Sequence, residues 1–108
     1  MADPRIRQIK IKTGVLKRLA KEEASYRTEA KQQEEKIEQL KAAAADSFLI
    51  KQHVASLQET LMMIPDSRRR MTIAHGDLLQ LLEAEEELSE SAEYQEAKSV
   101  LESVKLEA

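Results

Sequence analysis

The chain has 108 residues, enough for one small domain, and its formal net charge of −3 at pH 7 argues against nucleic acid as its main partner. Charged residues make up 34% of the sequence and aromatic residues 3%, with only two glycines and two prolines. A chain rich in Ala, Glu, Lys, Leu and Arg is typical of long helices, whereas strands need more β-branched and aromatic residues. We therefore expect an all-α protein.

The sequence contains no cysteine. Small secreted domains are usually held together by disulfides, so this absence favours a reducing, intracellular compartment. Residues 1–4 carry no apolar run of the kind that begins a secretory signal, and the longest apolar stretches fall well below the ~20 residues of a membrane span. We expect a cytoplasmic protein that does not enter the membrane.

The first helix is predicted over residues 4–43. Asp3 can cap its free N–H groups, and Pro4 suits the first helical position. Gly14 lies inside this helix and costs about 1 kcal/mol relative to Ala. The apolar residues that follow the spacing of three and four are Ile9, Leu16, Leu19, Tyr26, Ala30, Ile37 and Leu40. Such a helix would be about 60 Å long.

A tight turn is predicted near residues 44–47. The apolar register slips between Leu40 and Ile50, and Asp46 and Ser47 are both candidate N-caps for a new helix. The turn is otherwise poorly signalled, because a run of four alanines precedes Asp46 and alanine favours helix.

The second helix is predicted over residues 47–88, with a kink at Pro65. A proline inside a helix removes one backbone hydrogen bond, but the apolar register is preserved on both sides of it, which predicts one kinked helix rather than two. The apolar stripe is Ile50, Val54, Leu57, Leu61, Ile64, Met71, Leu78 and Leu82, with Arg68, His75 and Glu85 at its remaining positions.

A short third helix is predicted over residues 91–105, with its N-cap among Ser89, Glu90 and Ser91. Its apolar face is Tyr94, Ala97, Val100, Leu101 and Val104. Two long helices joined by a tight turn run antiparallel, so the third helix would lie beside the start of the first and the end of the second. The predicted fold is a single-domain, elongated three-helix bundle, with two long antiparallel helices plus a short third helix.

Charge supports this arrangement. Residues 1–21 carry seven basic groups and one acid, a net charge of +6. Residues 83–108 carry nine Glu and two Lys, a net charge of −7. The predicted bundle brings these oppositely charged segments together.

The sequence offers no catalytic constellation. His53 and His75 are the only histidines, and for His75, on the apolar seam, a packed side chain is favoured over a metal ligand. There is no Gly-rich phosphate loop and no H-E-x-x-H motif. Two bundled helices also provide no pocket of enzyme size. We expect a protein that is not an enzyme and has no metal or cofactor.

Two features point to protein binding. Met62 and Met63 fall outside the apolar seam, in the half of the second helix that the third helix does not cover, and exposed Met is adaptable at binding surfaces. Residues 68–70 are three consecutive arginines, which suit an acidic partner surface. Two plainer interpretations stay open: the methionines cover a flank of the first helix, and the arginines are solvated charge.

Four stretches resemble one known family: ADPRIRQIKIKTGVLKRLAKE at 2–22, EAKQQEEKIEQL at 29–40, LMMIPDSRRR at 61–70 and EYQEAKSVLESVKLEA at 93–108. Together they closely resemble the tubulin-binding cofactor A family, also called tubulin-specific chaperone A. The likeness spans the whole chain. MMIPD at 62–66 and the C-terminal SVKLEA are its most specific motifs.

The resemblance implies a three-helix bundle that captures β-tubulin after release from the cytosolic chaperonin. It implies that the protein holds β-tubulin in a quasi-native state on the route to αβ-tubulin heterodimer assembly. No nucleotide or metal is implied, and other tubulin-folding cofactors are further partners. We expect a cytoplasmic, cytoskeleton-associated monomer. The expected protein-binding residues are Met62, Met63, Asp66, Arg68, Arg69, Arg70, and, on the first helix, Gln32, Glu35 and Lys36.

Two alternative functions remain. One is a generic coiled-coil adaptor that dimerises through its apolar seams. The other is a nucleic-acid binder that uses the basic residues 5–21. The second alternative needs the basic face to stay open, whereas the predicted bundle places acidic residues beside it.

Overall fold

The computed structural model describes residues 3–104, which form three α-helices, one short 3-10 helix and no strand. The elements are α1 (Pro4–Ala42), α2 (Ser47–Ala84), η1 (Glu86–Leu88) and α3 (Ala92–Ser103). The predicted all-α class, with two long helices and one short helix, is confirmed. Residue 105, the predicted end of the third helix, lies outside the described residues. Within residues 3–104, no helix combines the length and apolar character that crossing a membrane requires.

Three polar side chains cap the helices. The Asp3 carboxylate accepts a hydrogen bond from the Arg5 backbone N–H at 2.9 Å, as predicted for the start of α1. Asp46 accepts from the Phe48 N–H at 2.8 Å and is therefore the cap of α2. Ser91 accepts from the Tyr94 N–H at 3.1 Å and caps α3. Each cap satisfies a backbone donor that has no partner inside its own helix.

A C-terminal capping motif ends α1 at the hairpin loop, and the run of alanines at 42–45 gives no sign of it in the sequence. Ala44 has φ 53°, in the left-handed region. Its N–H donates to the Lys41 carbonyl at 3.1 Å, and the Ala45 N–H donates to the Leu40 carbonyl at 3.0 Å. This pair of hydrogen bonds is the Schellman motif, whose left-handed position is usually glycine. Alanine there gives no turn signal in the sequence.

The second helix ends at Ala84, four residues before the predicted end at Leu88. Glu85 leaves the helix with φ −118° and ψ 40°, and η1 begins at Glu86. Three consecutive glutamates at 85–87 explain the early end, because carboxylates are unfavourable at the negative C-terminus of a helix. The Tyr94 hydroxyl donates to the Leu82 carbonyl at 3.0 Å and satisfies one of the last acceptors of α2. The helix is continuous through Pro65, as predicted, and the kink angle stays a prediction.

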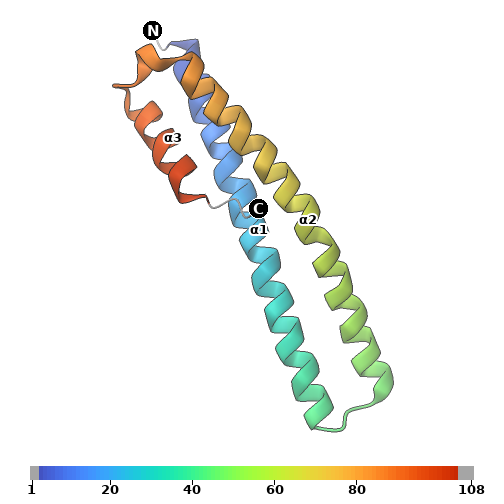
Figure 1. Cartoon of the computed structure of the whole chain (residues 1–108). Coiled ribbons are helices and arrows are strands. Elements are labelled where there is room, and N and C mark those ends of the chain that lie inside the picture. Colours follow the sequence, from blue (N-terminus) through green and yellow to red (C-terminus); the bar gives the residue numbers. More distant parts are fainter. Residues whose placement is uncertain (1–2, 105–108) are drawn as a thin grey trace. The chain divides into compact units, whose positions relative to one another are not determined.

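The chain divides into two compact units. The three-helix unit contains residues 1–21 and 69–108, of which 3–21 and 69–104 are described. The hairpin unit contains residues 22–68, which form the rest of α1, the loop and the first part of α2. The two units are described separately below (Figure 1).

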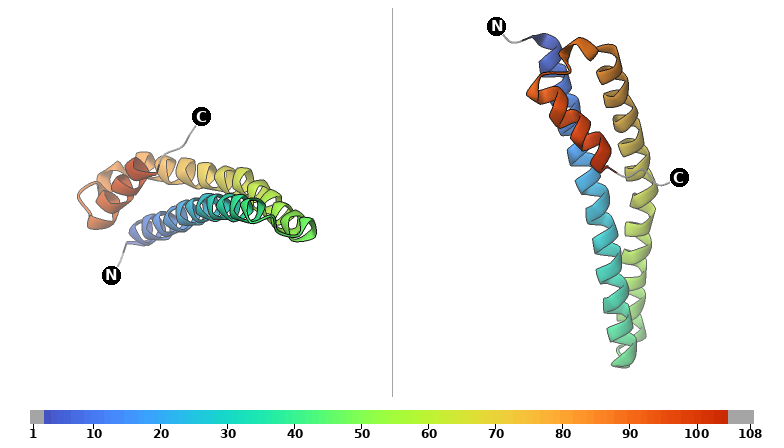
Figure 2. Two further views of the ribbon diagram at one scale, coloured as in Figure 1. Left: turned by 90° about the horizontal axis from the view of Figure 1, so that it is seen from below. Right: turned by 60° about the vertical axis from the view of Figure 1, so that its left-hand side comes forward.

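In the three-helix unit, α3 lies beside the N-terminal part of α1 (Figures 1 and 2). The buried apolar core is Ile9, Leu16, Met71, Ala74, Leu78, Leu82, Ala97 and Val100. His75 is partly buried, and its Nε2 lies 3.2 Å from the Leu101 carbonyl of α3. The packed role predicted for this histidine is therefore confirmed. The face predicted for the third helix also packs here, since Tyr94, Leu101 and Val104 contact the core.

In the hairpin unit, α1 and α2 run antiparallel from the loop at 43–46 (Figure 1). Only two apolar side chains of this unit are buried, Ala30 and Ile37. The other buried positions are polar: Glu23, Thr60 and Ser67. The apolar seams face each other within one chain, so this structure leaves them unavailable for the dimerisation that the adaptor alternative requires.

The seam of α2 in the hairpin unit differs from the predicted stripe by one position. Thr60 and Ser67 are buried, whereas Leu61, predicted on the seam, is 44% exposed and Arg68 only partly buried. The smaller, polar side chains at 60 and 67 thus occupy the interface with α1, and Leu61 lies on the flank. Hydrophobic periodicity does not predict this shift, because it assigns the more apolar residue to the seam.

Candidate protein-binding surface

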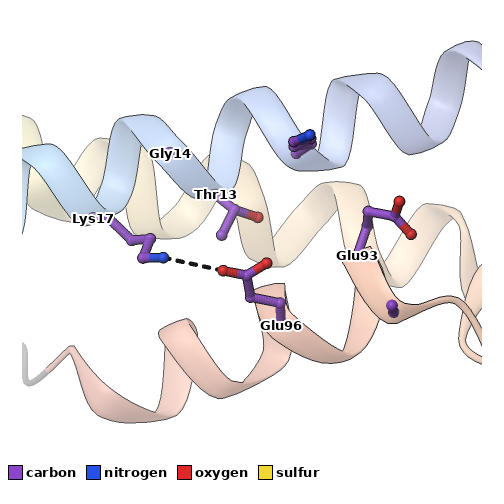
Figure 3. Close-up of a pocket in the computed structure, with 7 residues that line it drawn as sticks. Thr13, Gly14, Lys17, Glu93 and Glu96 are labelled. Atoms are coloured by element: carbon purple, nitrogen blue, oxygen red, sulfur yellow. Dashed lines mark hydrogen bonds and ion pairs between the residues drawn. The ribbon is translucent and has the colours of Figure 1, made fainter.

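A hollow between α1 and α3 is a feature of the three-helix unit (Figure 3). Its volume is about 370 Å³. It is lined by Lys10, Thr13, Gly14, Lys17, Ala92, Glu93 and Glu96. The Lys17 Nζ reaches across it to the Glu96 Oε1 at 3.0 Å, as Figure 3 shows. The lining offers paired charges and no nucleophile with an adjacent base, so it has no recognisable catalytic chemistry.

Arg5 links the start of α1 to the segment that joins α2 to α3. Its guanidinium bonds Glu85 at 3.1 Å and Asp3 at 2.7 Å, and it also pairs with Glu87. The side-chain hydrogen bond from Arg5 lowers the pKa of Asp3, and the same bond raises the pKa of Arg5. The oppositely charged end segments therefore meet as predicted, within the three-helix unit.

Apolar side chains gather on the surface of the hairpin unit. Met62 is 75% exposed, and Met63 and Leu61 beside it are also exposed. Near the loop, Phe48 is 66% exposed and Leu49 is exposed as well. Five of the eight large apolar side chains that are exposed within residues 3–104 therefore lie in this unit. This concentration of exposed apolar side chains makes the hairpin unit a candidate contact surface.

The sequence analysis missed Phe48, Leu49 and Leu61 as surface candidates. Phe48 precedes Met62 by fourteen residues, so the two point within about 40° of each other on α2 at 100° per residue. That spacing was the available signal for Phe48. Leu61 could not be found in this way, because its exposure depends on the shifted seam.

The predicted charged residues on α2 fall on both sides of the unit boundary. Asp66 and Arg68 are partly buried in the hairpin unit. Arg69 and Arg70 are exposed and belong to the three-helix unit. All four take part in interactions within the molecule. All four side chains therefore have contacts within the molecule, and Arg69 and Arg70 are also accessible to a partner.

The predicted residues of α1, namely Gln32, Glu35 and Lys36, are all exposed. Lys36 precedes the end of α1 by six residues, and Met62 follows the start of α2 by fifteen. At 1.5 Å per residue, Lys36 lies about 9 Å and Met62 about 23 Å from the loop. The residue of α1 at the level of Met62 is Arg27. The structure thus does not bring Lys36 alongside the methionines, and Gln32, about 15 Å from the loop, lies between the two levels.

A small all-α chain with open, charged hollows and exposed Met, Leu and Phe side chains has the features of a helical protein-binding module. Comparison with known proteins gives the family. The model of the family described as Tubulin binding cofactor A matches residues 4–101. The chain therefore belongs to the tubulin binding cofactor A family.

Relatives and solved structures agree with this assignment. The chain is 68% identical to tubulin-specific chaperone A from Gallus gallus and 58% identical to that from Homo sapiens, in both cases over 100% of both chains. The structure of human tubulin chaperone cofactor A has a TM-score of 0.83 at 55% identity, covering 95% of this chain and 100% of that chain. Tubulin folding cofactor A from Arabidopsis thaliana has a TM-score of 0.86 at 37% identity, covering 94% and 95%.

Proposed function

We propose that this chain is a tubulin-folding cofactor that captures β-tubulin after chaperonin release and holds it in a quasi-native state until heterodimer assembly. The relatives are named tubulin-specific chaperones and a tubulin-folding cofactor, and membership of the family supports the tubulin-folding role. The observation that carries the proposal is the exposed apolar surface of the hairpin unit around Met62.

The chemistry of that surface suits a partner that is not completely folded. Met is unbranched and polarisable, so Met62 and Met63 adapt to a surface whose geometry is not fixed. Leu61 and Phe48 are further exposed apolar side chains of the same unit. Holding such a partner requires accessible surface rather than an enclosed cleft.

The arginines provide a separate, charged contact for an acidic partner. Arg69 and Arg70 are exposed on α2 within the three-helix unit. Arg is over-represented among the residues that dominate interface energies, and it pairs with carboxylates through two hydrogen bonds. Gln32, Glu35 and Lys36 would form a separate, polar margin nearer the loop. The proposed place of action is the cytoplasm, and other tubulin-folding cofactors would receive the bound β-tubulin.

The double variant Met62→Ser with Met63→Ser tests the surface. Both side chains are exposed, so we expect the thermal transition to change little. Capture of β-tubulin should weaken at least tenfold, which corresponds to about 1.4 kcal/mol. Co-elution with β-tubulin during size-exclusion chromatography measures capture, and a parallel titration with α-tubulin measures selectivity for β-tubulin.

The matched control is Leu79→Ser, which removes a 43% exposed aliphatic side chain from the same helix in the three-helix unit. At 100° per residue, Leu79 points about 80° away from Arg69 and about 100° away from Met62, so we expect this variant to capture β-tubulin normally. If Leu79→Ser abolishes capture while the methionine variant binds as the parent does, the binding surface lies in the three-helix unit. Equal capture of α- and β-tubulin by the parent chain would refute selectivity for β-tubulin.

A further inference from the structure

A second surface lies on α1 within the three-helix unit. A shallow groove there is lined by Arg7, Lys10, Ile11, Gly14, Val15 and Arg18. At 100° per residue, Arg7, Gly14 and Arg18 point within about 40° of one another, so they form one stripe along the helix. The groove is distinct from the methionine surface, because residues 7–18 belong to the other unit.

The cations of this groove are not neutralised by the fold. Within residues 3–104, the ion pairs at the basic end of α1 are those of Arg5 with Asp3, Glu85 and Glu87 and that of Lys17 with Glu96. Arg7, Lys10 and Arg18 have no ion-pair partner in this part of the chain. No acidic side chain lines the groove. The expectation that acidic residues lie beside the basic face is therefore met for Arg5 and Lys17, whereas the three cations of the groove form no ion pair within the described residues.

The floor of the groove is apolar and has room. Ile11 is 50% exposed, and Val15 is half-buried beside it. Gly14 is exposed, and a Cβ added there would meet no atom within 4 Å. Glycine inside a helix costs about 1 kcal/mol relative to alanine. The missing side chain leaves open space beside the helix backbone between Ile11 and Arg18, here called the Gly14 notch.

We infer that this groove docks an acidic, amphipathic segment of a partner protein, with one aliphatic side chain in the Gly14 notch and carboxylates on Arg7, Lys10 and Arg18. The inference goes beyond the proposed capture surface and does not depend on it. The positive charges of the groove favour a partner segment with negative charge. Ile11 and Val15 set its apolar character.

A protein segment fits this groove better than nucleic acid does. The groove contains no aromatic side chain on which a base could stack. Eight glutamates between residues 83 and 104 belong to the same unit and would repel a continuous polyphosphate chain. Carboxylates placed on one face of a short segment avoid this repulsion.

The experiment uses the full chain and a fluorescein-labelled, 15-residue helical peptide of glutamates and alanines with leucines at i and i+4. Fluorescence anisotropy should show saturable binding that weakens as salt is added. The double variant Arg7→Gln with Arg18→Gln should bind at least tenfold more weakly. Gly14→Gln fills the notch with a good helix former, so it should also weaken binding while the thermal transition stays unchanged or rises.

The matched control is Lys31→Gln with Lys51→Gln, which makes the same change in net charge in the hairpin unit. Binding by this control should equal that of the parent chain. The inference is overturned if the control weakens binding as much as the arginine variant, if Gly14→Gln has no effect, or if the peptide does not bind saturably. It is also overturned if a single-stranded 15-nucleotide DNA binds the same groove more tightly than the peptide does.

Discussion

Ala44 holds a backbone conformation that suits glycine better than alanine. Its φ of 53° brings Cβ close to the following carbonyl oxygen, which costs roughly 1–2 kcal/mol for a residue with a side chain. The two hydrogen bonds that end α1 require this conformation, because they come from the N–H groups of Ala44 and Ala45.

Ala44→Gly should therefore raise the free energy of unfolding by about 1 kcal/mol, less the entropy that glycine adds to the unfolded chain. Urea denaturation followed by circular dichroism measures the change. The matched control is Ala42→Gly at the last residue of α1, where glycine should destabilise by up to about 1 kcal/mol. If both variants are destabilised equally, Ala44 is not under left-handed strain.

Ser67 is the second residue with a local cost. It is fully buried, and within the described residues its hydroxyl has no hydrogen-bond partner. A buried polar group without a partner costs about 1–3 kcal/mol. Ser67→Ala should stabilise the chain by about 1–2 kcal/mol, as measured by the midpoint of urea denaturation.

Ser56→Ala provides the comparison, because Ser56 is exposed on the same helix. That variant gains only helix propensity, about 0.5 kcal/mol. A gain at Ser67 no larger than the gain at Ser56 would mean that the buried hydroxyl is satisfied in solution.

For the helices, the hydropathy pattern predicted where each helix lies in the sequence better than it predicted which of its residues are buried. The seven apolar positions of the first stripe are all at least partly buried, and Asp3, Asp46 and Ser91 cap the helices where capping residues were expected. Spacing and capping are local properties of the chain, which is why one sequence was sufficient to find them.

Three features depended on contacts or backbone conformation that spacing does not encode. The seam of α2 buries Thr60 and Ser67 although both are polar. The chain reverses at Ala44, where the residue type predicts continued helix. The helix also ends before Leu88, because carboxylates accumulate from Glu85 onward. In the candidate site, the spacing of apolar residues predicted that the methionines are exposed. The position of Lys36 along the helix axis, relative to the methionines, could be found only once the ends of the loop were known.

At the scale of the whole chain, the two units have cores of different composition. Among the described residues, the three-helix unit buries eight apolar side chains, and the hairpin unit buries Ala30 and Ile37 together with three polar groups. Burying a large aliphatic side chain stabilises by about 1.5–3 kcal/mol, so the hairpin unit has the weaker core.

Backbone amides in the middle of the helices at 22–68 should therefore exchange with deuterium faster than those at 9–21 and 71–82. Hydrogen exchange with mass-spectrometric readout of peptides measures both sets in one experiment. Ser67→Ala should slow exchange in the hairpin unit. Uniform exchange across both ranges would show that the chain opens only as one cooperative body.

The oligomeric state is the remaining property of the whole chain. Because the apolar seams face each other within one chain, we expect a monomer at micromolar concentration. Light scattering should then give a mass near 12.3 kDa. A mass near twice that value at every concentration would favour the coiled-coil adaptor.

The turn at residues 43–46, here called the alanine hinge, also bears on whether two chains can exchange helices. Alanine favours helix, so a chain in which the turn at 43–46 becomes helical would join α1 and α2 into one long helix. Two such helices could pair reciprocally, each supplying the half that the other has released, which is how domain-swapped dimers form. Prolonged incubation at millimolar concentration should generate a slowly reverting dimer, visible by light scattering after dilution. Ala44→Gly, which favours the closed turn, should reduce the dimer fraction, and an unchanged fraction would place the hinge elsewhere.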